Sequence, residues 1–202
     1  MLLSQSDAEI MMFCDQDDVW LPDKIEKTTE EMQKLQQHHP GKPALVFTDL
    51  KVVDETLKEI ASSFWKYMKI QPQNVFNIYT LLANNPVVGC TMMINKPVKS
   101  LVLPFPEQAV MHDWWIALNV TRKGVINYVN RPTLLYRLHR QNSIGAIQIN
   151  SKYYAGRLKN FSKTISQNKD AVKMLKALGF SLSPAKFWWH KMWLTISKFF
   201  KR

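Results

Sequence analysis

Short apolar runs and longer amphipathic stretches alternate along most of this chain. The runs EIMMFC, ALVFTDLKVVD and PVVGCTMMI each predict a buried β-strand. The stretch VINYVNRPTLLYRLH predicts one or two more. The first run ends directly at acidic residues, so a cluster of charges follows a predicted core strand.

Between these runs the spacing of apolar residues changes to that of helices. LPDKIEKTTEEMQKLQQHH has Pro22 near its start, acids in its first turns, and apolar residues at Ile25, Met32 and Leu35. Helices are also predicted over about 72–84 and over MHDWWIALNVTRKG, which a glycine ends. The order of strand, helix, strand, helix predicts an α/β fold.

The charge of the chain is concentrated near its C-terminus. The 202 residues carry a net charge of +11. Residues 1–150 hold 15 basic and 15 acidic side chains, whereas residues 151–202 hold 12 basic side chains and one acid. We therefore expect a neutral body over 1–146 and a basic helical tail over 147–202. No nucleic-acid-binding module is recognisable, so we expect no nucleic-acid partner.

The two cysteines, Cys14 and Cys90, lie in apolar runs and form no CxxC pair. We interpret both as buried free thiols, which indicates a reducing compartment. The first residues show no signal-peptide pattern, and no apolar run approaches the ~20 residues that a membrane-spanning helix needs.

Three carboxylates, Asp15, Asp17 and Asp18, follow the first predicted strand within four positions. Like charges this close repel one another, and the carboxyl ends of buried strands are where α/β sheets bind ligands. Such oxygen ligands suit Mg²⁺ or Mn²⁺, which would offset the repulsion and stabilise a departing diphosphate. The alternative is that the acids cap the following helix, with Asp18 or Asp23 near its N-terminus.

Two later segments supply further candidates. In HDWW, Asp113 follows His112 at a predicted helix start, where partial burial would raise the pKa of Asp113 and suit a general base. The alternative is a helix cap beside core tryptophans. In YRLHRQN, Arg137 can pair with phosphate oxygens, and His139 can be a metal ligand or a phosphate donor. The alternative there is a solvated basic loop.

Four ordered motifs together resemble family 2 glycosyltransferases of the GT-A fold, particularly bacterial rhamnosyltransferase-like members. They are FCDQDDVWLPDKI, NNPVVGCTMMI, LPFPEQAVMHDWWIAL and YRLHRQNSIGA, and they cover residues from about 8 to 146. The resemblance implies a partial GT-A, Rossmann-like mixed sheet flanked by helices. It also implies that the N-terminal part of the nucleotide-binding unit is missing, because the family has several strands before its acidic motif.

The resemblance implies roles for the acidic candidates. The DQD stretch matches the family's DxD motif, in which Asp15 contacts the donor ribose or metal-bound water, Asp17 ligates the metal, and Asp18 assists. Asp113 matches the base that deprotonates the acceptor, with His112 where the family usually has Glu.

The remaining candidates surround these acids. Arg137 and His139 match the loop that closes over metal and diphosphate, and Gly89 lies where the family's sheet approaches the donor sugar and acceptor. We place His112 and Trp114 on the acceptor side.

The implied reaction is inverting transfer of a sugar, with rhamnose as a candidate, from a nucleotide-diphosphate sugar to a polysaccharide or lipid-linked glycan acceptor. A single displacement with inversion needs one base and no enzyme nucleophile, unlike the paired carboxylates of retaining glycosidases. Two alternatives stay open: an inactive truncated remnant that binds a membrane or a partner, and a metal-dependent phosphohydrolase.

The final segment, SPAKFWWHKMWLTISKFFKR, predicts an amphipathic helix over about 184–202. Its aromatic face opposite lysines suits a helix in a membrane interface. The candidates for membrane contact are Trp188, Trp189, Trp193, Phe199 and Phe200. The alternative is a helix docked on the domain's own core or on a partner. We expect a cytoplasmic protein, peripheral at the inner face of the cell membrane, in cell-envelope polysaccharide biosynthesis.

Overall fold

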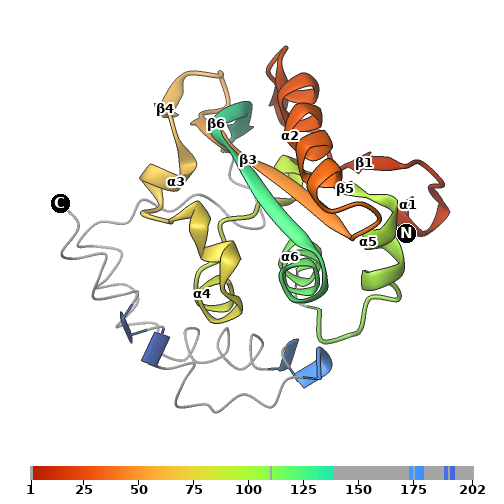
Figure 1. Cartoon of the computed structure of the whole chain (residues 1–202). Helices are drawn as coiled ribbons and strands as arrows, with labels where there is room; N and C mark the ends of the chain where they lie inside the picture. Colours follow the sequence, from red (N-terminus) through yellow and green to blue (C-terminus); the bar gives the residue numbers. More distant parts are fainter. Residues whose placement is uncertain are drawn as a thin grey trace.

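A computed structural model describes residues 2–109 and 111–138, together with 173–174, 176–179, 189–190 and 192–193. Its centre is a six-stranded sheet in the order β1-β5-β3-β6-β2, with β4 paired to the end of β3 (Figure 1). The strands are β1 Ile10–Met12, β2 Val19–Trp20, β3 Ala44–Val53, β4 Glu59–Ala61, β5 Met92–Asn95 and β6 Val125–Arg137. The sheet is mixed, because β3 and β6 pair in parallel and the other pairs are antiparallel.

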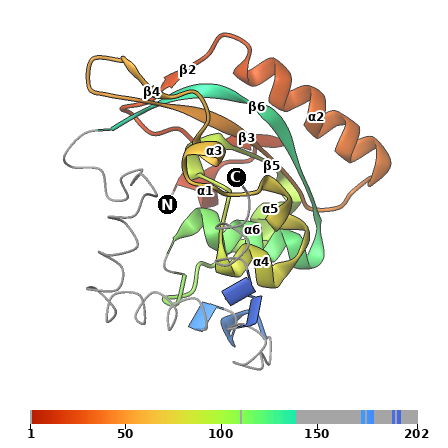
Figure 2. The same ribbon diagram turned by 90° about the vertical axis from the view of Figure 1, so that its left-hand side faces the viewer.

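Helices cover both faces of this sheet. They are α1 Leu2–Gln5, α2 Lys24–His38, α3 Phe64–Tyr67, α4 Ile78–Ala83, α5 Lys96–Val102 and α6 His112–Lys123, with 3₁₀ turns η1 Pro72–Phe76 and η2 Gly89–Thr91. Alternate side chains of β3 point to opposite faces, so Val46 packs with Met32 of α2 while Phe47 joins the larger core with α4, α5 and α6. Figure 2 shows α2 on one side of the sheet and these three helices on the other. The predicted mixed α/β fold is confirmed.

Several segments differ from the sequence predictions. In PVVGCTMMI only β5 is a strand, because the chain first turns through η2. The helical region predicted over about 72–84 is present but is divided into η1 and α4, and the Asn77 side chain caps α4 by accepting hydrogen bonds from the N–H groups of Tyr79 and Thr80. Both cysteines are free and Cys90 is buried, but Cys14 is exposed because it lies in the loop after β1, so its predicted burial is wrong.

The strand that precedes the acidic cluster lies at an edge of the sheet. Among the described residues β1 pairs only with β5. Because β1 and β3 are both antiparallel to β5, β1 runs in the direction of β3 and β6. The carboxyl ends of these three strands and the start of β5 therefore meet at one end of the sheet. Residues 13–18 leave β1 there and cross toward β2, which pairs with β6.

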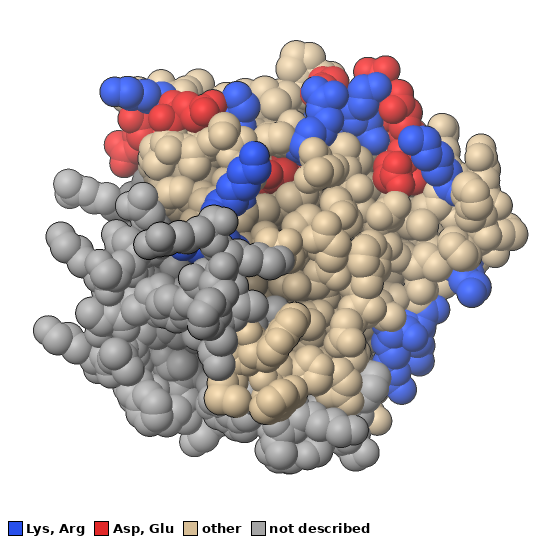
Figure 3. All heavy atoms as spheres, turned by 60° about the vertical axis from the view of Figure 1, so that its left-hand side comes forward, with Lys and Arg blue, Asp and Glu red and all other residues tan. Residues whose placement is uncertain are grey.

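Charged side chains of both signs lie close together on the face shown in Figure 3, mainly along one rim. This mixture is consistent with the zero net charge of residues 1–150. Most of the predicted basic tail lies outside the described residues, as do His139, Trp188, Phe199 and Phe200. Among the residues that are described, no helix is long and apolar enough to cross a membrane.

Gly124 fixes how α6 leads into β6. Its N–H donates to the Val120 carbonyl at 2.8 Å, and the N–H of Val125 donates to the Pro43 carbonyl at 2.8 Å, where β6 begins its parallel pairing with β3. A Cβ atom at position 124 would lie 2.2 Å from that same Pro43 oxygen. The junction therefore requires glycine for a close approach of two backbones.

We expect Gly124→Ala to lower the free energy of unfolding by about 1–3 kcal/mol, because a backbone carbonyl cannot move aside as a flexible side chain can. Urea denaturation measures the change. Lys123→Ala, at the exposed neighbouring position, is the control and should stay within about 0.5 kcal/mol of wild type. Equal stability of Gly124→Ala and wild type would contradict the close approach.

Candidate functional site

The acidic turn after β1 lies against the start of η2. A carboxylate oxygen of Asp15, a carboxylate oxygen of Asp18 and the Sγ atom of Cys90 all lie within 4.8 Å of one another. Asp15 is exposed, Asp18 is half-buried and Cys90 is buried. Three potential ligand atoms from two separate loops thus converge at the end of the sheet, as the position of the acids after a strand predicted.

Asp18 has one satisfied and one unsatisfied carboxylate oxygen. The N–H of Arg137 donates to its Oδ1 at 3.2 Å, whereas its Oδ2 is buried and has no hydrogen-bond partner among the described residues. Burial raises the pKa of Asp18, the Cys90 thiol and the Arg137 N–H oppose this shift, and the charges of Asp15 and Asp17 add to it. A cation at this point would bind the free oxygen and relieve the repulsion.

The Cys90 side chain is not ionised and so is not available as a thiolate ligand for a metal. Burial is the main cause that raises the pKa of its thiol, and the negative charges of Asp18 and Asp15 raise it further. The thiol therefore stays protonated, and the thiolate is the form that binds metals. The usable donors are the carboxylate oxygens of Asp15 and Asp18, a hard set that fits Mg²⁺ or Mn²⁺ better than a thiolate-seeking metal.

Arg137, at the end of β6, holds the acidic turn in place. Its Nε donates to the Asp17 carbonyl oxygen at 3.0 Å, and its Nη1 donates to the Glu55 carbonyl oxygen at 3.4 Å. The sequence predicted a metal set of Asp15, Asp17 and His139. The convergent group instead pairs Asp15 with Asp18, while Asp17 is not part of it and His139 lies outside the described residues.

Asp113 lies in the first turn of α6 and is only 4% exposed. The N–H of Trp114 donates to its Oδ1 at 2.6 Å. Burial raises the pKa of Asp113, and the neighbouring His112, together with the backbone N–H groups of Trp114 and Gly89, opposes the shift. A carboxylate with a raised pKa is a stronger base once it is ionised, which agrees with the predicted role.

Gly89 and Cys90, which are consecutive, connect Asp113 to the acidic turn. A Cβ atom at Gly89 would lie 2.8 Å from the Nε2 atom of His112, so this backbone passes directly against the start of α6. The next residue, Cys90, lies against Asp15 and Asp18. The ring of Phe13, which follows β1, stacks on His112 with centroids 5.6 Å apart. The carboxylate groups at the two ends therefore belong to one region.

Trp114, predicted on the acceptor side, is partly buried against the core. Its indole Nε1 donates to the Leu81 carbonyl oxygen of α4 at 3.3 Å. The helix-cap alternative for the acids is not seen at Asp23. Asp23 occupies the N-cap position of α2, but its side chain makes no capping bond and instead pairs with Arg131 at 2.5 Å.

Sequence reasoning missed Lys24, whose side chain is fully buried at the base of the site. Its Nζ donates to the Cys90 carbonyl oxygen at 3.0 Å and to Thr133 Oγ1 at 3.5 Å, and lies 5.0 Å from the centre of the Trp20 ring. Burial lowers the pKa of Lys24 to about 8, and the charge of Asp18 opposes this shift. Ile25, by contrast, is 58% exposed, because α2 turns its Lys24 face to the sheet.

No protein-family model matches this chain. Part of it is similar to dTDP-rhamnosyl transferase RfbG of Shigella flexneri, with 29% identity over 156 residues. The matched region is 72% of this chain and 48% of the relative, so the chain spans about half the length of the curated relative it matches. The similarity supports a glycosyltransferase relationship.

Burial of the Lys24 ammonium makes the free energy of unfolding depend on pH. Between pH 8 and the ordinary lysine pKa of 10.5, the unfolded chain keeps a proton that the folded chain has lost, so folding becomes more favourable as the pH rises. We expect wild type to gain about 3 kcal/mol relative to Lys24→Met between pH 7 and pH 10.5.

Urea denaturation in EDTA measures this difference. Lys34→Met, at a position where the side chain is 64% exposed, is the control and should show no such change. A constant difference between wild type and Lys24→Met across this pH range would contradict a buried ammonium.

Proposed function

We propose that this chain carries the catalytic residues of an inverting glycosyltransferase, which moves a sugar from a nucleotide-diphosphate donor to a polysaccharide or lipid-linked glycan. Rhamnose is the leading candidate for the sugar, because the similar Shigella flexneri protein is named as a dTDP-rhamnosyl transferase. The observation that carries the proposal is the junction of Gly89 and Cys90, which brings Asp113 and the two metal-binding candidates into one region.

In the proposed site, Asp15 and Asp18 would hold Mn²⁺ or Mg²⁺, which would supply charge neutralisation for a departing diphosphate. Arg137 fixes the acidic turn through the Asp17 carbonyl and the Asp18 carboxylate. These contacts position oxygen ligands at the carboxyl end of the sheet before any substrate arrives, which lowers the cost of organising the site.

Asp113 is the proposed base. It removes the proton from the acceptor hydroxyl while that oxygen forms a bond to the anomeric carbon, and the bond from this carbon to the diphosphate oxygen breaks with its electron pair. Burial of Asp113 favours this role, because the raised pKa brings the proton affinity of the carboxylate closer to that of the hydroxyl. His112, whose ring stacks on Phe13, is the proposed acceptor-side residue next to this base.

We expect Asp113→Asn to lower sugar transfer by roughly 10²- to 10⁴-fold without weakening Mn²⁺ binding, and Asp18→Asn to weaken both. Transfer is measured as Mn²⁺-dependent release of dTDP from dTDP-rhamnose with a lipid-linked glycan extract, and metal binding by calorimetry. Asp7→Asn, whose carboxylate is 93% exposed on the N-terminal segment, is the control.

Sugar transfer by Asp113→Asn at the wild-type rate would refute the role of Asp113 as the general base. Retained Mn²⁺ binding without transfer by the unmodified chain would favour the alternative of a non-catalytic remnant, and phosphate release from simple esters would favour a phosphohydrolase.

We also propose that the basic tail contacts an anionic membrane. Trp189, Met192 and Trp193 in the described pieces of this tail are 62%, 51% and 56% exposed. Large exposed aromatic side chains in a segment rich in lysine are typical of helices that lie in the membrane interface. The neighbouring His190 stacks on Tyr79 of α4 with ring centroids 5.0 Å apart, which brings this part of the tail against the body.

We expect the chain to float with phosphatidylglycerol vesicles and not with phosphatidylcholine vesicles, and the Trp189→Ala/Trp193→Ala variant to lose most of this binding. Phe76→Ala is the matched control, because Phe76 is similarly exposed, at 57%, but lies in η1. Equal flotation of the control and the double variant would contradict the proposal.

A further inference from the structure

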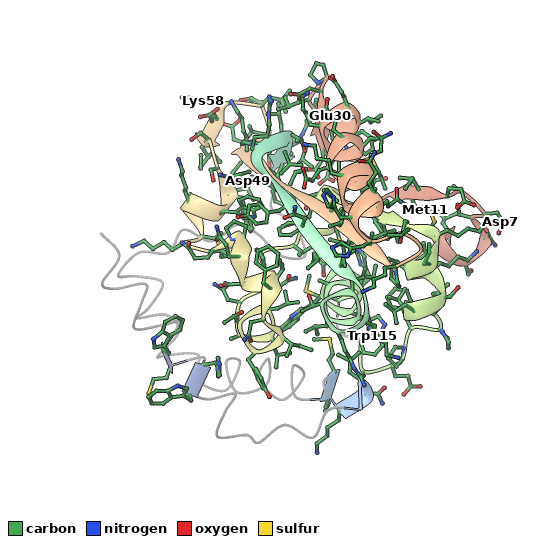
Figure 4. The ribbon with its side chains drawn as sticks, in the orientation of Figure 1. Asp7, Met11, Glu30, Asp49, Lys58 and Trp115 are labelled. Atoms are coloured by element: carbon green, nitrogen blue, oxygen red, sulfur yellow. The ribbon has the colours of Figure 1, made fainter. Side chains whose placement is uncertain are left out.

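A second polar pocket lies beside α3 and η1, apart from the acidic turn. It has a volume of about 620 Å³, within the range of ~300–1,000 Å³ that is usual for ligand pockets. Its wall includes residues of β3 and β6, the α3–η1 connection and Asn84 after α4. Figure 4 labels one of these residues, Asp49, on β3. Side chains that carry amides are frequent in this wall: Gln71, Gln73, Asn74, Asn84 and Asn130.

Asp49 supplies the only carboxylate among the described residues of the wall, and the protein already satisfies it. Asp49 Oδ1 accepts the N–H of Leu50 at 2.8 Å and that of Trp65 at 3.2 Å, and its Oδ2 accepts the hydroxyl of Ser63 at 2.5 Å. These bonds fix the start of α3 on the sheet. Asp49 is therefore a structural residue, and it leaves little acceptor capacity for a ligand.

The charge available to a ligand in this pocket is positive. Lys66 and Lys69 contribute to the wall, and no described residue forms an ion pair with either ammonium group. Among the described residues, the side chains of Gln71, Asn84 and Asn130 likewise have no hydrogen-bond partner. The wall thus offers two cations and several amides that can donate and accept hydrogen bonds.

Lys69 occupies an unfavourable backbone position. Its φ is +49°, and the N–H of Ile70 donates to the Trp65 carbonyl at 2.8 Å, so Lys69 is the left-handed residue that ends α3. Glycine is the residue that suits this position. A lysine here has a conformational cost, while it places an ammonium group in the pocket wall.

Among the described residues, the pocket wall has no exposed aromatic surface for stacking. Trp65 is the aromatic residue in the wall, but it is only 4% exposed, and its Nε1 donates to the Pro86 carbonyl at 3.2 Å. Exposed aromatic side chains are a common support for nucleotide bases. Amides and ammonium groups without an exposed ring instead match a ligand with many hydroxyls and an anionic group.

The pocket is joined to the proposed transfer site by one short segment. Asn74 donates to the Asn84 carbonyl at 3.3 Å, and Trp65 holds the Pro86 carbonyl, so the wall is bonded to the segment that leads to Gly89 and Cys90. We propose that this pocket binds an acidic saccharide, with its hydroxyls on the amides and its carboxylate or phosphate on Lys66 and Lys69. The assignment of this pocket as a distal subsite for the glycan acceptor rests on the proposed function. The binding of an acidic saccharide in the pocket does not.

Calorimetry in EDTA, without donor or Mn²⁺, tests the pocket separately from the transfer reaction. The probes are trigalacturonate, glucose 1-phosphate, neutral maltotriose and inorganic phosphate. We expect one of the two acidic sugars to bind at least tenfold more tightly than maltotriose and inorganic phosphate. Which of the two binds more tightly distinguishes a carboxylate from a phosphate. We expect added salt to weaken this binding.

Lys69→Gly is expected to weaken this binding at least tenfold and also to raise the urea midpoint of unfolding. Leu57→Gly is the matched control, because Leu57 also has a positive φ, of 69°, but lies in the turn before β4. It should raise the urea midpoint and leave binding unchanged.

Equal binding of maltotriose and the acidic sugars, equal binding of inorganic phosphate, or unchanged affinity in Lys69→Gly would overturn the proposal. Asp113→Asn should bind the acidic sugar as wild type does, so loss of transfer and loss of binding are separate results.

Discussion

The candidate site depends on how the backbone at Gly89 and Cys90 passes between Asp113 and the carboxylates of Asp15 and Asp18. One side of this segment lies against the start of α6, where a Cβ atom added at Gly89 would lie 2.8 Å from Nε2 of the His112 ring. The other side lies against Asp15 and Asp18. The Lys24 ammonium, buried beneath, holds the Cys90 carbonyl and ties the segment to α2 and β6. The positive charge of this buried ammonium offsets part of the repulsion between the nearby carboxylates.

Sequence patterns predicted the larger elements because each of them has a long and regular signal. β3, α2 and α6 lie where the periodicity and the flanking proline and glycine residues placed them. The shorter elements were less predictable. The turn η2 interrupts an apolar run whose composition alone reads as strand, and Asn77 divides the region 72–84 through a side-chain cap that competes with a continuous helix.

Sequence patterns singled out the acids of the candidate site and Arg137, but not Lys24. Asp15, Asp18 and Asp113 stood out because acids beside apolar runs need an explanation. Lys24 did not, because a lysine in the first turn of an amphipathic helix normally lies in solvent, and its burial depends on tertiary contacts to Cys90 and Thr133. The sequence pattern also did not predict which acids of the turn lie close together. Arg137, 119 positions away from Asp18, orients that carboxylate through its N–H.

The position of β1 has a mechanical consequence for this site. Its three residues, Ile10–Met12, are hydrogen-bonded on one side to β5, and no described residue pairs with their other side. The main-chain groups on that side are free to accept an added strand, as sheet edges do. Because Phe13 and the acidic turn follow β1 directly, a strand added along this edge would constrain the backbone that carries Asp15 and Asp18.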